Sequence, residues 1–306
     1  MPKKVNNILF IVNQLLSDTA LAGGEVRTIN LLRYYSSDQS FKVFVQAPTA
    51  VKKLFTPLKD VVYACAEISF IEKVVFKKDK TLNAFEIFML FFTRANASIS
   101  QILDAKDFPD MVYSTGDFFC DVIPAWLIKK RHPQTVWAAC THHIIENPFY
   151  RKQNSFLRNI FSLLLQRFSY ELMKNEADMI ITDNNQVEAT LVKIGFEAKK
   201  IKIMGNALDV KYTKDLIKGR NKTKQKERVV FFARLSPTKG VFDLPGVFSR
   251  IVKKYPKMNL DLVGAYEDSV GSKLKNMFTQ YGILNRVVFH GFLKDKKDAI
   301  TIILSG

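Results

Sequence analysis

Residues 228–240 read RVVFFARLSPTKG, a short apolar run followed by a polar loop that carries two cations and ends in glycine. The run Arg228–Ala233 is typical of a buried β-strand, and Val241–Lys254, which stops near Pro256, predicts a helix. The alternation continues with two strands and the helix between them, Asn259–Val263, Arg286–His290 and Lys273–Tyr281. Strands that alternate with helices indicate a parallel sheet with helices on both faces.

The preceding two thirds of the chain show the same alternation of apolar runs and helical patterns. The expected strands are Val5–Val12, Lys42–Gln46, Val61–Ala64, Asp110–Ser114, Thr135–Thr141, Ala177–Thr182 and Ile201–Met204. The expected helices are Glu25–Tyr35, Cys120–Lys130, Ser155–Lys174 and Gln186–Ile194. Because 306 residues is about twice the usual domain size, we expect an α/β fold with two Rossmann-like, doubly wound parallel-sheet domains.

A strongly basic segment separates the two sets of strands. Lys211–Arg228 holds 8 basic and 2 acidic residues among few apolar ones, which is typical of a solvated linker. Just before it, Asn206 and Asp209 are expected to cap a turn. We expect an N-terminal domain over residues 1–210, a basic linker over 211–227 and a partial second domain over 228–306.

The net charge of +17 is concentrated in residues 211–306, which carry 20 Lys or Arg and 8 Asp or Glu. A solvated linker is the simpler explanation of this charge. A more specific explanation is attraction to an acidic membrane surface, which would place the protein at the periphery of the inner membrane face. A nucleic acid partner is not expected, because basic and aromatic residues do not interleave and zinc-knuckle spacing is absent.

Cysteine usage and hydropathy address the location of the protein. Three scattered cysteines, Cys65, Cys120 and Cys140, indicate reduced thiols and a cytoplasmic location. The apolar run after the first four residues is too short for a signal peptide. No stretch approaches the roughly 20 apolar residues of a membrane span, and the best candidate, Ala84–Phe92, contains Glu86.

Candidate binding residues follow the strands, because a doubly wound sheet binds its ligand at the carboxyl ends of its strands. Gly23 and Gly24 open the first helix, where backbone N–H groups can approach an anion; a plain turn is the alternative. Arg234 ends its strand and Lys239 begins the next helix, so that two cations converge as a diphosphate requires. Two unrelated exposed cations are the alternative.

Two histidines follow another strand end. His142 and His143 come directly after TVWAACT, where an imidazole can hydrogen-bond a sugar hydroxyl or transfer a proton; a structural role is the alternative. A metal is not expected, because no third ligand stands at zinc spacing. Cys140 alternates to the opposite strand face from Thr141, which argues against a Cys–His site.

The expected helix Ser155–Lys174 carries an apolar stripe at helical spacing. Its members are Phe156, Ile160, Leu164 and Phe168. Packing in the core is the simpler explanation. The alternative is a membrane-facing surface whose cations, Arg151, Lys152, Arg158 and Arg167, would meet lipid headgroups.

Together these motifs resemble those of the large retaining glycosyltransferase family 4, in the family's order over nearly the whole chain. The motifs are Gly23-Gly24, Pro109-Asp110-Met111-Val112, the stretch from Asp178 to Asp209, residues 232–240, Leu262-Val263-Gly264 and Val288-Phe289-His290-Gly291-Phe292. The resemblance implies the GT-B architecture of two Rossmann-like domains. It also implies retaining transfer of a sugar from a nucleotide-sugar donor to a glycan or lipid-linked acceptor.

The resemblance implies roles for individual residues. Arg234 and Lys239 would neutralise the donor diphosphate, and Gly23-Gly24 would hold the transferred sugar and phosphate. His142 would contact the sugar as the catalytic residue. Further donor contacts would be His143 and Gly264. No metal or other cofactor is expected, and no residue is identified as a nucleophile.

The sequence departs from the family pattern in three places. Ala233 stands where the family has the glycine of G-R, and Asn206-Ala207-Leu208-Asp209 replaces N-G-V-D. The third departure is that the chain ends at Gly306, before the family's E-x-x-x-x-x-x-x-E segment. We therefore expect a truncated second domain and weak or absent activity.

Three alternatives stay open from the sequence. A non-catalytic binding or scaffold protein would keep the two cations and lack the distal glutamates. A sugar-nucleotide epimerase of GT-B architecture would release a free altered sugar without an acceptor. A basic nucleic-acid binder would show binding that falls steeply with salt.

Overall fold

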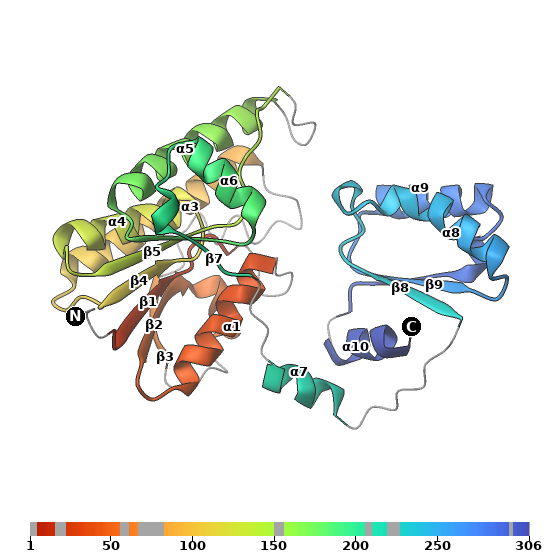
Figure 1. The fold of residues 1–306 in the computed structure, drawn as a ribbon, viewed down its shortest axis with the longest axis horizontal. Helices are drawn as coiled ribbons and strands as arrows, with labels where there is room; N and C mark the ends of the chain where they lie inside the picture. The colour runs from red at the N-terminus through yellow and green to blue at the C-terminus, as the bar shows by residue number, and fades with distance from the viewer. Residues whose placement is uncertain are drawn as a thin grey trace. The chain divides into compact units, whose positions relative to one another are not determined.

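The computed structural model describes residues 5–15, 23–55, 61–66, 83–149, 156–205, 210–218, 227–293 and 296–305. Its contacts divide the chain into two units, Met1–Asp209 and Val210–Gly306. Each unit is built on its own parallel sheet, as Figure 1 shows. The expected α/β class with parallel sheets is confirmed.

The N-terminal unit contains a seven-stranded sheet in the order β3-β2-β1-β4-β5-β6-β7, and every pair of neighbours is parallel. The strands are β1 (Asn7–Ile11), β2 (Lys42–Pro48), β3 (Val61–Ala66), β4 (Met111–Ser114), β5 (Val136–Thr141), β6 (Met179–Thr182) and β7 (Ile201–Ile203). The order reverses between β1 and β4. In an open parallel sheet this switch point is where ligands bind.

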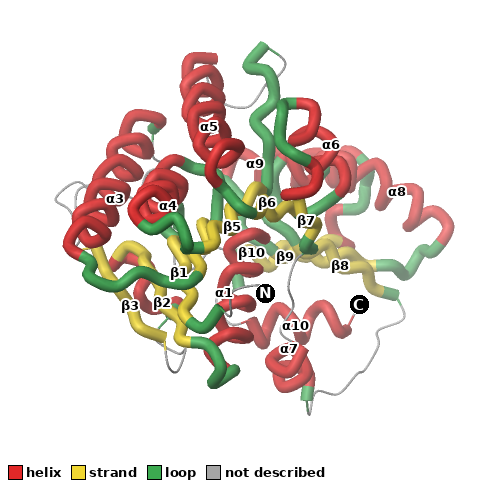
Figure 2. Tube along the Cα trace, turned by 60° about the vertical axis from the view of Figure 1, so that its left-hand side comes forward, coloured by secondary structure: helices red, strands yellow, loops and turns green. Residues whose placement is uncertain are grey.

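Helices cover both faces of this sheet, with α1 on one face and α3, α4, α5 and α6 on the other (Figures 1 and 2). Their bounds are α1 (Gly23–Ser37), α3 (Ala84–Asp104), α4 (Phe119–Arg131), α5 (Phe156–Glu176) and α6 (Asn185–Lys193), with 3₁₀ turns at Thr49–Leu54 and Ala198–Lys200. Each face has its own apolar cluster. The unit is therefore a three-layer sandwich.

Strand β5 shows how the sequence directs side chains to the two faces. Ala138 and Cys140 pack in the cluster on the α1 side, whereas Trp137 and Ala139 pack on the α4 and α5 side. All four are fully buried, because successive strand residues point to opposite faces of a covered sheet. The same alternation directs His142, two residues beyond Cys140, toward α1.

Helix α3 is absent from the elements expected from the sequence. Its start is a capping box: the Asn83 side chain accepts from the Glu86 N–H at 2.9 Å, and the Glu86 carboxylate accepts from the Asn83 N–H at 2.9 Å. Asn83 and Glu86 thus cap the start of a helix that packs on the sheet. None of the described helices combines the length and the hydropathy that a membrane span requires.

Helix α5 corrects the expectation that its apolar stripe packs in the core. Phe156, Leu164 and Phe168 are 45%, 60% and 50% exposed, and only Ile160 of the stripe is half-buried. The helix instead buries a mostly polar face, whose members are Asn159, Gln166, Ser169, Tyr170 and Met173. The reason is a buried hydrogen-bonding partner, Asp117, which accepts from Gln166 at 2.8 Å and from Tyr170 at 2.9 Å.

The C-terminal unit contains a three-stranded parallel sheet in the order β10-β9-β8. Its elements are α7 (Val210–Ile217), β8 (Arg228–Phe232), α8 (Leu244–Lys254), β9 (Asn259–Val263), α9 (Asp268–Gln280), β10 (Val287–Gly291) and α10 (Lys296–Ser305). Helices α8 and α9 cover one face and α10 lies against the other (Figure 1). A single apolar cluster lies beneath α8 and α9.

Part of the expected linker over 211–227 is helical, whereas residues 219–226 lie outside the described residues. Val210–Ile217 is helical because apolar residues recur on one side of an otherwise basic segment. The expected turn at Asn206–Asp209 lies outside the described residues.

We predict that Gly264→Ala lowers the free energy of unfolding by about 3 kcal/mol. Gly264 has φ +149°, and an added Cβ would lie 1.9 Å from the carbonyl oxygen of Ala233. The matched control is Gly246→Ala within helix α8, where the added Cβ would meet only the Tyr281 hydroxyl, at 3.5 Å. Chemical denaturation should show a large loss for the first variant and none for the second; equal effects would contradict the close-approach explanation.

Candidate functional site

Polar residues of the N-terminal unit gather where β4, β5 and β6 end. Thr115 directly follows β4, His142 follows β5 and Asp183 follows β6. The first turns of α1 supply Gly24 and Arg27 to the same place. This is the carboxyl edge of the sheet next to its switch point, where a ligand is expected.

Arg27 is the centre of this group. Its side chain is fully buried and forms an ion pair with Asp183. One guanidinium nitrogen also donates to the carbonyl of Met204 at 2.8 Å. The other donates to Cys140 Sγ and lies 3.0 Å from His142 Nδ1. A single buried cation therefore joins α1 to the ends of β5, β6 and β7.

Both ring nitrogens of His142 have hydrogen-bonding partners. Its Nε2 lies 3.0 Å from the carbonyl oxygen of Thr115. Its Nδ1 lies 3.0 Å from an Arg27 guanidinium nitrogen and 3.3 Å from Asp183 Oδ1. Burial lowers the pKa of His142 below its ordinary value of 6.5, and the Arg27 charge lowers it further, against the opposing effect of Asp183. The imidazole is neutral at pH 7.

Gly24 lies directly against this imidazole. An added Cβ at Gly24 would fall 2.6 Å from both Cε1 and Nε2 of His142, closer than carbon atoms approach without bonding. Gly23, the first residue of α1, is exposed beside it. The structure thus brings together two separately predicted features, the glycine pair and the strand-end histidine.

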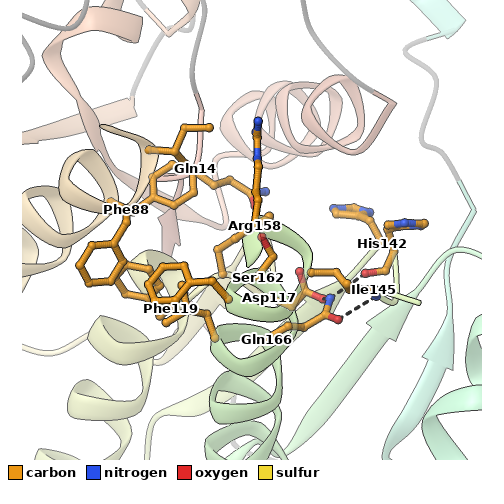
Figure 3. Close-up of a pocket in the computed structure, with 15 residues that line it drawn as sticks. Gln14, Phe88, Asp117, Phe119, His142, Ile145, Arg158, Ser162 and Gln166 are labelled. Atoms are coloured by element: carbon orange, nitrogen blue, oxygen red, sulfur yellow. Dashed lines mark hydrogen bonds between the residues drawn. The ribbon is translucent and has the colours of Figure 1, made fainter. Parts of the chain in front are cut away.

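A cavity of about 330 Å³ opens beside His142 and runs between α3, α4 and α5 (Figure 3). Its polar end contains His142, His143, Asp117 and Gln166, and its other end contains aromatic rings together with Gln14. The apolar lining is Ile87, Phe88, Phe91, Phe118, Phe119, Ile145, Phe161 and Leu165. A ligand in this cavity would need a polar part and an apolar part.

Asp117 is the buried acid of this cavity. Burial raises its pKa to about 6, although hydrogen bonds from Tyr170 and Gln166 favour the ionised form. Gln166 also donates to the carbonyl of His143 at 2.8 Å and accepts from the N–H of Ile145. These bonds fix the backbone that follows β5. His143 itself is exposed at the cavity.

The predicted cations of the C-terminal unit follow β8. Arg234 is exposed two residues beyond the strand, and neither Arg234 nor Lys239 forms an ion pair among the described residues. The sequence predicted that Lys239 begins the next helix, and this prediction is wrong. It ends a 3₁₀ turn, and Gly240 in the left-handed conformation and a second 3₁₀ turn separate it from α8. Pro245, at the start of α8, defines where that helix begins.

Gly264 also lies at the carboxyl edge of the smaller sheet. Its N–H donates to the carbonyl of Gly291 at 2.9 Å, and its Cα faces the carbonyl of Ala233. This packing alone requires glycine. A donor contact at Gly264 stays a prediction.

No metal site is evident among the described residues, where no three potential ligands cluster. The alternation between Cys140 and Thr141, from which the sequence argued against a Cys–His site, does not separate Cys140 from His142. Cys140 and His142 share a face, and Sγ lies 3.5 Å from Nε2. Burial raises the pKa of Cys140 to about 12, so this thiol stays protonated.

Sequence reasoning missed Arg27, Asp183 and Asp117. Asp183 and Asp117 follow strand ends, so the rule that selected His142 would have found both. Arg27 gave no such signal, because arginine in a helix is normally exposed.

Comparison with known proteins adds evidence on both units. Residues 213–304 match the family model described as glycosyl transferases group 1. This segment contains the loop with Arg234 and Lys239. No curated protein matches the chain in sequence.

Solved structures resemble the chain over nearly its whole length. Anabaena HepE, solved with UDP and glucose, has a TM-score of 0.60 at 18% identity, covering 96% of this chain and 72% of that one. A glycosyltransferase from Rickettsia africae scores 0.60 at 15% identity, covering 98% and 72%. The UDP-GlcNAc 2-epimerase of Neisseria meningitidis, bound to UDP-GlcNAc, scores 0.57 at 10% identity, covering 98% and 75%. At these identities the likeness shows the fold, which is GT-B.

We predict that the pKa of His142 moves in opposite directions in two variants. Arg27→Gln removes a cation, so the pKa should rise toward 6.5, whereas Asp183→Asn removes an anion, so it should fall further. An NMR titration of the imidazole C–H signals, assigned with His142→Gln, measures both. Circular dichroism verifies folding. A wild-type pKa at or above 6.5, or shifts of the same sign, would contradict the arrangement.

Proposed function

We propose that this chain, whose residues 213–304 belong to the glycosyl transferases group 1 family, transfers a sugar from a nucleotide-sugar donor to an acceptor. The observation that carries the proposal is the position of Arg234 and Lys239. Both are exposed cations in the family-matched segment, in the loop at the carboxyl end of β8, the first strand of the C-terminal unit.

Arg234 and Lys239 would bind the donor diphosphate. Two cations neutralise the charge that develops on the departing nucleoside diphosphate, and this stabilises the transition state. The solved complexes of HepE with UDP-glucose and with UDP support a nucleoside diphosphate as the leaving group. No metal or cofactor is part of the proposal, because the cations would take that role.

The N-terminal unit would hold the sugar. Gly23-Gly24 presents backbone at the start of α1, and a neutral His142 beside it would contact a sugar hydroxyl. For this contact the imidazole must exchange its bond to Arg27 or to Thr115. His143 and Gly264 would provide further donor contacts. We propose retention of configuration by analogy with the resembling family.

We further propose that the acceptor is a glycan or is lipid-linked. We also propose that this protein is cytoplasmic and contacts the inner, acidic face of a membrane. The exposed stripe of Phe156, Leu164 and Phe168 on α5 supports the membrane contact, since aromatic and leucine side chains on one helix face can enter a lipid interface. Arg158 and Arg167 on the same helix would meet headgroups. Arg151 and Lys152 lie outside the described residues.

Sugar-nucleotide epimerisation is the second candidate function. Its support is the likeness to UDP-GlcNAc 2-epimerases at TM-scores of 0.52 to 0.57. An epimerase would convert the donor without an acceptor, whereas a transferase would need one.

We predict that Arg234→Ala and Lys239→Ala each weaken binding of a nucleoside diphosphate by about 10- to 100-fold, the usual effect of losing a hydrogen bond to a charged group. The control is Lys257→Ala, which removes the same charge just before β9, at the opposite end of the sheet. Calorimetric titration against a panel of nucleoside diphosphates measures the three affinities.

The titration separates a diphosphate site from general charge attraction. Affinity that is lost in both loop variants and kept in Lys257→Ala supports the site and identifies the base. Equal losses in all three variants would show that the two loop cations act only as general surface charge, and would contradict the proposed diphosphate site.

A further inference from the structure

We infer that the cavity beside His142 binds the apolar chain of a lipid-linked acceptor, an inference that rests on the proposed sugar transfer. The cavity belongs entirely to the N-terminal unit, and its polar end includes the residue proposed to contact the sugar. An acceptor bound there would therefore have its reactive end at His142. The inference selects one of the two acceptor classes left open above.

The apolar end of the cavity is built from aromatic rings. Phe88 of α3 packs against Phe119 of α4 with ring centroids 5.7 Å apart and against Phe161 of α5 at 5.1 Å. Figure 3 shows Phe88 and Phe119 at one end of the cavity and His142 at the other. Gln14 is the polar side chain labelled beside Phe88 at this end (Figure 3). Most hydroxyls of a sugar buried among these rings would still lack partners, so a hydrocarbon fits this end better than a free glycan.

The polar end of the cavity matches the polar part of a lipid-linked acceptor. Asp117 and Gln166 lie beside His142 and His143, and Arg158 lines the cavity between the two ends (Figure 3). Gln166 already bonds to Asp117, to the His143 carbonyl and to the Ile145 N–H, so it orients this end rather than binding a hydroxyl itself. Carboxylate and imidazole groups hydrogen-bond hydroxyls, and a guanidinium suits an anionic group that joins a lipid to a sugar. The order of these groups is the order of parts in an amphiphile.

The cavity also opens onto an apolar surface. Phe118 and Phe161 line the cavity and are 41% and 39% exposed. A volume of about 330 Å³ is at the lower end of the roughly 300–1,000 Å³ usual for ligand sites, so only part of a long chain would fit. The part of the lipid chain that does not fit would lie against the exposed stripe of α5, which includes Leu164 and Phe168.

The test uses octyl glucoside below its micelle concentration as the probe and glucose as the reference, titrated calorimetrically into the full chain. We expect saturable binding of octyl glucoside and none of glucose over the same range. Phe161→Ala should weaken that binding about 10-fold, because it removes a partly buried ring. Ser162→Phe, which fills the cavity from a half-buried position, should abolish it.

The matched control is Phe168→Ala on the same helix. Phe168 is exposed and does not line the cavity, so its removal should leave octyl glucoside binding unchanged. Thermal unfolding of each variant verifies that it folds. Equal losses in Phe161→Ala and Phe168→Ala would indicate adsorption to the apolar surface and overturn the inference.

Parallel titrations with nucleoside diphosphate separate this inference from the proposed function. A folded chain that binds nucleoside diphosphate, but octyl glucoside no better than glucose, would overturn the cavity assignment and leave the transferase proposal. A chain that binds octyl glucoside in the cavity but no nucleotide would remove the transferase proposal, and the cavity would remain an amphiphile site.

Discussion

The buried guanidinium of Arg27 is the interaction on which the N-terminal site depends. It pairs with Asp183 and bonds to Cys140, His142 and the carbonyl of Met204, so the ends of three strands and the first turns of α1 share one cation. A buried charge is stable only when it is paired and hydrogen-bonded. Its partners, the imidazole of His142 among them, are therefore held in place.

The same arrangement explains the division of chemistry between the faces of the sheet. On the α1 side, the start of a helix and a neutral imidazole meet at the switch point, which suits a polar ligand. On the opposite side, α5 turns polar residues inward to Asp117 and leaves aromatic residues outward. An amphipathic cavity results where the two arrangements meet.

The fold and the strand-end residues could be predicted from the sequence, because short apolar runs that alternate with helical patterns determine the order of strands and helices. The strand ends were predicted closely, which located His142 and Arg234. The stripe on α5 was misread, because periodicity shows that one side of a helix is apolar and not which side is buried; a carboxylate on another element decided that. Arg27 was missed for a related reason, since its partners are distant in sequence.

The measurement that tests the central claim most directly is the release of nucleoside diphosphate from a panel of sugar nucleotides, followed with and without an alkyl glycoside acceptor. The account predicts release that depends on the acceptor, together with a glycosylated product that retains the donor's anomeric configuration. Acceptor-independent formation of a free, altered sugar by a folded chain that binds the nucleotide would contradict it.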